Sequence, residues 1–332
     1  MEGLFGQVLP YVFEILPYLH ARNIFPDWEI PSTLYGYPPH GLIIPGVVDL
    51  AYQATPGPKV EVNLLQLRIR HSQVLGNDWR RLSTIWNDYF CIPHRITESA
   101  ATLGSLSDAV GVHYRGNDKL TASWDTNLVT HNDYLLIIRD FLATRPEFRR
   151  IFLATDDFRF YHFLKLNLSL DIINLGEVGF HKVEAGLEEL AAKADRAMLD
   201  CVLLSRCGAV LLTSSALPSF TKILNPELEI YRVSASKLFA AIPYFPVAYI
   251  PCYNSSSPQI SALVDRLMKN DWTREGDAQF YNVPFAAGPR YLLPSALRRV
   301  YNYVRGVEQW RGFGWIGRLR IHLRKWALER SR

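Results

Sequence analysis

The residues best suited to chemistry form a polar run that directly follows a short apolar stretch. The apolar stretch is 110–112, and the run reads His113, Tyr114, Arg115, Gly116, Asn117, Asp118 and Lys119. A guanidinium presents parallel N–H donors that fit the oxygens of a phosphate. An open α/β sheet places its ligand beyond the carboxyl ends of its strands. The run therefore predicts an anion site at the end of a strand over 110–114.

Two further polar runs follow apolar stretches in the same way. One comes after 151–154 and the other after 209–212, and their members are Thr155, Asp156, Asp157, Thr213, Ser214 and Ser215. A guanine base needs a carboxylate that accepts hydrogen bonds from its N1–H and exocyclic amine, and hydroxyl groups suit a pyrophosphate. The three runs together supply the groups that a guanine nucleotide requires.

Each run also has a purely structural interpretation. A His-x-Arg pair at a strand end is commonly a hydrogen-bonded surface pair. The two aspartates suit the N-cap of a helix that begins at 158. We favour a ligand site because all three runs fall at the ends of strands in one predicted sheet.

Alternating elements must position these runs. Strands are predicted over 110–114, 151–154, 171–175, 209–212 and 228–233, and helices over 131–144, 158–166, 184–206 and 218–224. Strands that alternate with helices form βαβ units and a parallel sheet. The predicted fold class is therefore α/β.

The flanking segments are less regular. Gly3 and Gly6 form a turn ahead of an apolar helical pattern, which suits either an anion-binding loop at a helix N-terminus or a merely tight turn. Residues 31–60 are rich in Pro, Gly and Tyr and are predicted to be irregular loop. A helix is predicted over 78–90, and 234–290 is predicted to be loop around one helix at 256–269.

Composition indicates a globular protein with room for two domains. The chain has 332 residues, of which 48% are hydrophobic and 20% are charged. It contains no apolar run long enough to span a bilayer and no signal-peptide pattern. Its four cysteines, Cys91, Cys201, Cys207 and Cys252, lack metal-ligand spacing. We expect buried free thiols and a reducing, cytoplasmic location.

The positive charge is concentrated in the tail at 290–332. This segment holds eleven Lys and Arg against two Glu, so the rest of the chain is net negative although the whole is +4. Trp315, Ile316, Leu319, Leu323 and Trp326 fall on one face of a helix. Such a helix suits peripheral binding at the anionic inner face of a membrane, or packing against the first domain. Nucleic-acid binding would have to depend on this tail alone and is not expected.

The three runs resemble the peptide motifs of the GDP-fucose-dependent fucosyltransferases, which include core α1,6-, nodulation and protein O-fucosyltransferases. Residues 113–119 match the H-x-R-x-x-D-K motif at its His, Arg, Asp and Lys. Residues 151–157 resemble the second motif, and 200–207 followed by 218–221 resemble the third. The resemblance covers about 110–225 in the sequence, with a weaker likeness over 3–30.

The resemblance implies a fold, a domain plan and a reaction. The fold is GT-B-like, with two Rossmann-type domains that face across a cleft. An N-terminal acceptor-side α/β domain would span 1–108, a donor-binding domain 109–289, and a basic helical tail 290–332. The family's first strand ends just before its glycine-rich loop, so we expect the first domain to lack it. The donor would be GDP-fucose, transfer would invert the anomeric centre, and no metal or other cofactor is expected.

Donor-binding roles follow from the matched positions. Arg115 would bind the β-phosphate with support from His113, Asp157 or Asp156 would read the guanine, and hydroxyls of the third motif would close on the phosphates. The full set implied for the donor is Gly6, His113, Arg115, Gly116, Asp118, Asp156, Asp157, Thr213, Ser214, Ser215, Ser219, Phe220 and Thr221.

Three residues are expected to act in catalysis. Arg115 would stabilise the departing GDP, and Lys119 would lie near the leaving group. The core α1,6 enzymes have a carboxylate base where this chain has Ser123, so the neighbouring Asp125 is the expected base. The alternative is that a phosphate oxygen of the leaving group takes the proton.

The function expected from these motifs is transfer of fucose from GDP-fucose to a hydroxyl of a glycan or lipid-linked glycan. Two alternatives stay open. The chain could use another nucleotide sugar, which would keep the sheet and change the pocket around the sugar. It could also be a non-catalytic nucleotide- or sugar-binding protein, as the absent first strand suggests.

Overall fold

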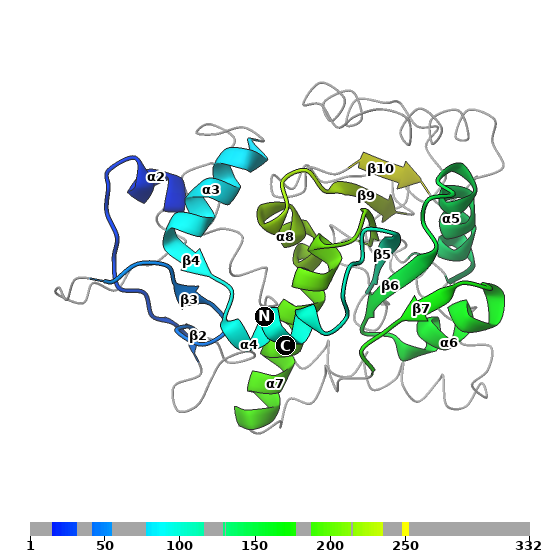
Figure 1. Cartoon of the computed structure of the whole chain (residues 1–332), viewed down its shortest axis with the longest axis horizontal. Helices are drawn as coiled ribbons and strands as arrows, with labels where there is room; N and C mark the ends of the chain where they lie inside the picture. The colour runs from blue at the N-terminus through cyan, green and yellow to red at the C-terminus, as the bar shows by residue number, and fades with distance from the viewer. Residues whose placement is uncertain are drawn as a thin grey trace, which may run out of the picture.

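The centre of the molecule is a six-stranded sheet with helices on both faces (Figure 1). The structure, a computed structural model, describes residues 15–31, 42–54, 78–115, 129, 131–176, 187–213, 215–234 and 248–251. Shorter helices and two two-stranded sheets lie beside the central sheet. The described chain is therefore a mixed α/β protein with a parallel sheet.

All strand pairs in the central sheet are parallel. Its strands are β5 (Ala109–Tyr114), β6 (Arg150–Thr155), β7 (Asp171–Ile173), β8 (Ala209–Leu212), β9 (Glu229–Ser234) and β10 (Ala248–Pro251). Their order across the sheet is β10-β9-β8-β5-β6-β7. The chain begins in the middle with β5, moves outward through β6 to β7, and then returns to the other side of β5 with β8. This is the strand order of the doubly wound dinucleotide-binding fold.

Two layers of helices bury the sheet. One apolar cluster joins Val110, Val112 and Leu153 to helices α5 (His131–Thr144) and α6 (Phe158–Asn167). The other joins Phe152 and Val210 to helices α7 (Leu187–Ser205) and α8 (Ala216–Leu224). Successive side chains of a strand point to opposite faces. Because both faces are covered, the strands read in sequence as continuous apolar runs.

Gly111 marks the close approach of α7 to the middle of β5. A Cβ atom at residue 111 would lie 2.8 Å from Cδ2 of Leu204 and 3.2 Å from Sγ of Cys207. Leu204 and Cys207 are themselves buried in the core, so they have little room to move away. The strand therefore needs a residue without a side chain here. Side-chain alternation also assigns His113 to the face that α7 covers.

The described residues before β5 form three helices and two short antiparallel strand pairs. The helices are α2 (Leu16–His20), α3 (Trp79–Tyr89) and α4 (His94–Ala101). The strands are β1 (Ile30–Pro31) paired with β2 (Leu42–Ile44), and β3 (Asp49–Leu50) paired with β4 (Phe90–Cys91). The side chain of Asp78 caps α3 by accepting a hydrogen bond from the backbone N–H of Arg81.

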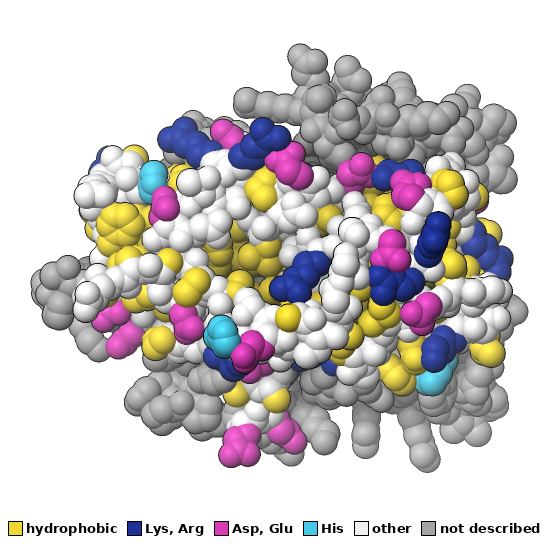
Figure 2. Space-filling view, viewed as in Figure 1, with side chains coloured by type: hydrophobic (Ala, Val, Ile, Leu, Met, Phe, Trp, Pro, Cys, Tyr) yellow, Lys and Arg dark blue, Asp and Glu magenta, His cyan; other side chains and the backbone are white. Residues whose placement is uncertain are grey.

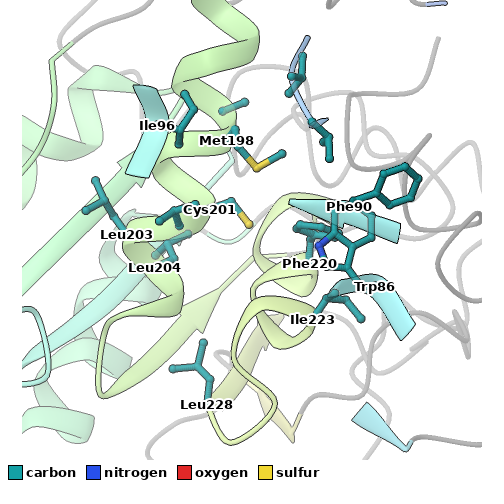
Figure 3. Packing of buried hydrophobic residues seen from close by; sticks show 14 of the residues in the cluster. Trp86, Phe90, Ile96, Met198, Cys201, Leu203, Leu204, Phe220, Ile223 and Leu228 are labelled. Carbon is teal, nitrogen blue, oxygen red and sulfur yellow. The ribbon is translucent and has the colours of Figure 1, made fainter. Parts of the chain in front are cut away.

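This first part packs directly on the helices of the sheet. Helix α3 contacts α8, and α4 contacts α7. Trp86 meets Phe220 edge to face with ring centroids 4.9 Å apart, and Figure 3 shows both rings beside Phe90. Ile96 and Met198 belong to the same buried cluster. Residues on both sides of the predicted boundary at 108/109 therefore share one core, and the division into domains stays a prediction.

The parallel α/β unit predicted over 110–233 is confirmed, with small shifts at the ends of its elements. The helix predicted over 78–90 is confirmed as α3. The prediction of irregular loop over 31–60 is wrong at β2 and β3. Within 234–290 the prediction of loop is wrong at β10, and helix α4 was not predicted. The antiparallel strands are two or three residues long and depend on partners distant in sequence, so they leave no local periodicity.

Two of the cysteines match the prediction and one does not. Cys201 and Cys207 are buried free thiols, and burial raises the pKa of both. Cys91 is a free thiol but is exposed, so its predicted burial is wrong. Cys91 follows Phe90 in the two-residue strand β4. The Phe90 side chain takes the buried position of that strand, so the Cys91 side chain lies on the exposed side. Cys252 lies outside the described residues.

The surface gives no single-sign patch in the view of Figure 2, where basic and acidic side chains are intermixed over the described parts. Among the helices that the structure describes, none is both long and apolar enough to cross a bilayer. The predictions for the turn at Gly3 and Gly6, the helix at 256–269 and the basic tail at 290–332 all fall outside the described residues.

Candidate functional site at the strand ends

The carboxyl ends of β5 and β8 lie side by side where the strand order reverses. The two strands are hydrogen-bonded neighbours, with His113 paired to Leu212 at the last position of the register. The chain leaves β5 toward α5 and leaves β8 toward α8, and these helices cover opposite faces of the sheet. The helices that follow the two strands therefore lie on opposite faces of the sheet, and in open α/β sheets a crevice at such a point holds the ligand.

Thr213 joins the two strand ends. Its backbone N–H donates to the carbonyl oxygen of His113 at 3.0 Å. Its side-chain Oγ1 accepts a 2.9 Å hydrogen bond from the backbone N–H of Arg115. The hydroxyl of Tyr134 donates to the same His113 carbonyl at 3.2 Å. Thr213 is buried, so these bonds are shielded from water and fix the backbone from which the Arg115 side chain starts.

His113 and Arg115 thus lie together with Thr213, as three of the residues predicted for the donor site. The His113 side chain is buried, and Arg115 is half-buried at the strand end. The imidazole projects toward α7, on the same face as Gly111. The arrangement combines a guanidinium with a buried imidazole at one edge of the sheet, which suits an anionic ligand.

Asp157 is engaged inside the protein. Its carboxylate caps α6 by accepting from the backbone N–H of Arg159 at 3.2 Å, and it accepts from Nε of the same arginine at 2.7 Å. Nε2 of His131 lies 3.2 Å from its Oδ2. Burial alone would raise the pKa of Asp157, but the hydrogen bonds from His131 and Arg159, together with their charges, outweigh burial and lower it. The helix-cap interpretation of this residue is therefore confirmed.

Aromatic rings enclose the His131–Asp157 pair. The imidazole of His131 lies 5.1 Å from the ring of Phe160 and 5.3 Å from that of Tyr114, between centroids. The Tyr114 hydroxyl donates to the carbonyl of Val129 at 2.8 Å. With its carboxylate held in this cluster, Asp157 contributes to the end of β6 as a structural group. Asp156, half-buried beside it, is the other aspartate at the same strand end.

Two residues predicted to contact the donor are core residues. Phe220 and Thr221 are fully buried in α8. The Phe220 ring packs on Trp86, and the Thr221 hydroxyl donates to the carbonyl of Pro218 in the preceding turn. In the described structure both residues hold α8 in place, and their contact with a donor stays a prediction. Phe220 has this role because its neighbours are apolar, and Thr221 because its hydroxyl is bonded to the backbone of its own helix.

The remaining predicted residues are placed only in part. Ser215 is buried at the N-cap position of α8, and Ser219 lies within that helix. Gly6, Gly116, Asp118, Lys119, Asp125 and Ser214 lie outside the described residues. Within the described parts of the chain, no three His, Cys, Asp or Glu side chains group in a way that could hold a metal ion.

The sequence analysis missed Lys193, a buried cation in the first half of α7. Burial lowers the pKa of Lys193, and the positive charge of Arg115 lowers it further. The charge of Arg115, at the end of β5, therefore acts on a side chain of α7. The sequence did indicate that Lys193 lies on the apolar face of its helix, because Lys193, Ala197 and Leu204 recur at helical spacing and share one face.

The His131–Asp157 cluster generates a prediction about acid stability. The folded-state pKa of Asp157 lies below its unfolded value of about 4. Its stabilising contribution is therefore present above about pH 4 and is lost as the pH falls through the folded-state pKa. We expect Asp157→Asn to lower the free energy of unfolding by about 1–3 kcal/mol at pH 7.

Urea unfolding of both proteins between pH 7 and pH 3 measures this difference. The gap between the two free energies should narrow as the pH falls below about 4, because the wild-type carboxylate is then progressively protonated. A gap that stays constant over the whole range would show that the carboxylate charge does not matter.

Solved structures of fucosyltransferases are similar to part of this chain. No protein-family model matches the chain, and no curated protein matches it significantly in sequence. Among the similar structures, NodZ α-1,6-fucosyltransferase soaked with GDP-fucose is 16% identical over 46% of this chain and 49% of its own, with a TM-score of 0.34. NodZ co-crystallized with GDP is 18% identical over 46% and 47%, with a TM-score of 0.32.

A third similar structure, POFUT1 in complex with GDP, is 12% identical over 43% of this chain and 46% of its own, with a TM-score of 0.28. The matched part of this chain thus spans about half the length of the solved structures it resembles. Scores of this size report a partial overlap and do not by themselves assign the chain to a family.

Proposed function

We propose that this protein is a glycosyltransferase that binds GDP-fucose at the carboxyl ends of β5 and β8 and transfers fucose to a glycan hydroxyl. The observation that carries the proposal is the joining of Arg115 to Thr213 at the reversal of strand order. That is the position where a doubly wound sheet binds nucleotides. The order of the three sequence motifs along 113–221 supports GDP-fucose as the donor.

The donor would lie with its pyrophosphate against Arg115. The guanidinium can hold two oxygens of the β-phosphate. Because Asp157 is committed to His131 and Arg159, we assign the guanine to Asp156. A carboxylate there would accept from the N1–H and amine of guanine, which adenine and uracil do not offer together.

Transfer would be a single displacement with inversion. The acceptor oxygen attacks the anomeric carbon of fucose as the bond from that carbon to the β-phosphate oxygen breaks. Negative charge grows on the departing GDP, so Arg115 binds the transition state more tightly than the ground state. The proton of the acceptor hydroxyl goes to a base, for which we propose Asp125.

The proposal extends to the whole chain as a two-domain GT-B-like enzyme. The donor domain would be 109–289, and the acceptor would enter from the side of 1–108. The acceptor would be a glycan, lipid-linked if the basic tail at 290–332 binds an anionic membrane. No divalent ion is assigned to the reaction.

Isothermal titration with GDP in the presence of EDTA tests the donor assignment. We expect GDP to bind without a metal and more tightly than UDP or ADP, because only guanine offers the N1–H and amine pair. Binding of UDP alone would indicate another nucleotide sugar. Binding that requires a divalent ion would contradict the metal-free site.

Arg115→Ala should lower the turnover of GDP-fucose by about 10²–10³-fold, because it removes one stabiliser of the charge on the leaving group. Arg115→Lys should lose less, since a lysine keeps the charge without the paired donors. Arg139→Ala is the matched control, because Arg139 is an exposed arginine of α5 whose Nη2 donates to the Asn167 carbonyl. Near-normal turnover of Arg115→Ala would remove this residue from the site.

Asp125→Asn should lower turnover by roughly 10²–10⁴-fold if Asp125 deprotonates the acceptor. Its affinity for GDP should stay unchanged, since a base acts on the acceptor. Initial rates and GDP titrations of the same variant separate the two effects. Full activity would instead favour proton transfer to a phosphate oxygen of the leaving group.

A further inference from the structure

The hydrogen-bond ladder between β5 and β8 ends irregularly at Thr213. The two strands are parallel neighbours, and their last paired residues are His113 and Leu212. The ladder continues by one hydrogen bond, because the backbone N–H of Thr213 donates to the carbonyl of His113 at 3.0 Å. In a regular parallel ladder the next hydrogen bond would run from the N–H of Arg115 to the backbone carbonyl of Thr213. The structure departs from the regular pattern at that hydrogen bond.

A side-chain hydroxyl takes the place of the backbone carbonyl. The N–H of Arg115 donates to Oγ1 of Thr213 at 2.9 Å. The same hydroxyl donates to the carbonyl of His113 at 3.5 Å, which is long for a hydrogen bond of this kind. Thr213 thus bonds to β5 through its backbone N–H and through both functions of its hydroxyl. The side chain completes the ladder where regular backbone pairing stops.

This substitution allows β8 to turn away from β5 while the N–H of Arg115 keeps an acceptor. Helix α8 begins at Ala216, with Ser215 at its N-cap position, so the chain turns toward its helix within two residues of Thr213. A backbone N–H that loses its acceptor in a buried place is costly. The Thr213 side chain avoids that cost, because it reaches back to β5 from a backbone that is already leaving the sheet.

The contact also fixes the backbone of β5 just ahead of the Arg115 side chain. Thr213 is only 5% exposed, so its hydrogen bonds are shielded from water. The carbonyl of His113 accepts a further hydrogen bond from the hydroxyl of Tyr134 in α5 at 3.2 Å. The two peptide groups that flank Tyr114 are therefore both held. Together they set the direction in which the Arg115 side chain leaves the strand.

We propose that Thr213 is a positioning residue that directs the Arg115 guanidinium toward the diphosphate of the donor. This inference rests on the proposed binding of GDP at the same strand ends. Thr213 would act on the donor through Arg115, because its hydroxyl is bonded to the backbone of β5. A guanidinium must meet two phosphate oxygens at once, so a small displacement of the backbone at 115 would lose the paired geometry. Tight binding of GDP would therefore require a hydroxyl at 213.

Titration of the full chain with GDP tests the coupling of Thr213 to Arg115 in a double-mutant cycle. Thr213→Val removes the hydroxyl and keeps the shape of the side chain, and it should weaken GDP binding by roughly 10-fold. Arg115→Ala should weaken it by roughly 10- to 100-fold. In the Arg115→Ala protein, Thr213→Val should change the affinity by no more than about twofold, because no guanidinium is left to direct.

Three further variants separate positioning from a general loss of structure. Thr213→Ser keeps the hydroxyl and should bind GDP nearly as well as the wild type. Thr213→Ala removes the hydroxyl in a smaller side chain, so it gives the same test if Thr213→Val does not fold. Ser205→Ala is the matched control, because it removes another buried hydroxyl, whose Oγ donates to the Val202 carbonyl within α7 at 2.7 Å. It should leave the affinity for GDP unchanged.

Amide hydrogen exchange of Arg115 measures the contact without any ligand. Its N–H should exchange about tenfold faster in Thr213→Val than in the wild type, because its acceptor has been removed. Thr213→Ser should keep the wild-type rate. An unchanged rate in Thr213→Val would overturn the proposal, since the hydroxyl would then not hold the end of β5.

The outcomes separate this inference from the proposed function. Wild-type affinity of Thr213→Val for GDP would exclude a positioning role and leave the function standing. Equal losses from Thr213→Val with and without Arg115 would show that Thr213 acts independently of the guanidinium, and would also overturn the inference alone. A wild-type protein that binds no GDP would overturn both.

Discussion

The packing of α7 on β5 at Gly111 is the constraint on which the rest of the structure depends. A side chain at this position would meet Leu204 and Cys207, so the helix can lie this close only over glycine. The contact sets the level of α7 along the sheet. That level places Arg196 against the carbonyls after β7. The opposite surface of the same helix receives α4.

The elements of the sheet could be predicted because they are parallel and buried. Strands such as 151–154 and 209–212 are covered on both faces, so they appear as continuous apolar runs. Helix α5 was predictable from its repeating apolar positions. The short strands β1 to β4 and helix α4 were not, because each is stabilised by partners distant in the sequence.

The candidate site was predictable only at the level of strand ends. Side-chain types could place His113, Arg115 and Thr213 at one edge of the sheet. They could not show that the Asp157 carboxylate binds His131 and Arg159 inside the protein. An aspartate suits a helix N-cap and a ligand contact equally well, so its type alone does not separate the two roles. Nor could they show that Phe220 packs on Trp86, a residue 134 positions earlier in the sequence. Lys193 was missed because a lysine inside a long helix is ordinarily solvated.

The shared core of the first part and the sheet has a consequence for motion. The described contacts between α3 and α8 and between α4 and α7 bury Trp86, Ile96, Met198 and Phe220 in one cluster. A bidentate pair between Arg80 and Glu227 and another between Arg95 and Asp195 span the same junction. Opening these two parts as rigid bodies would expose apolar surface and break both ion pairs. Among the described residues, therefore, a hinge at 108/109 would have to break this shared core before the two parts could separate.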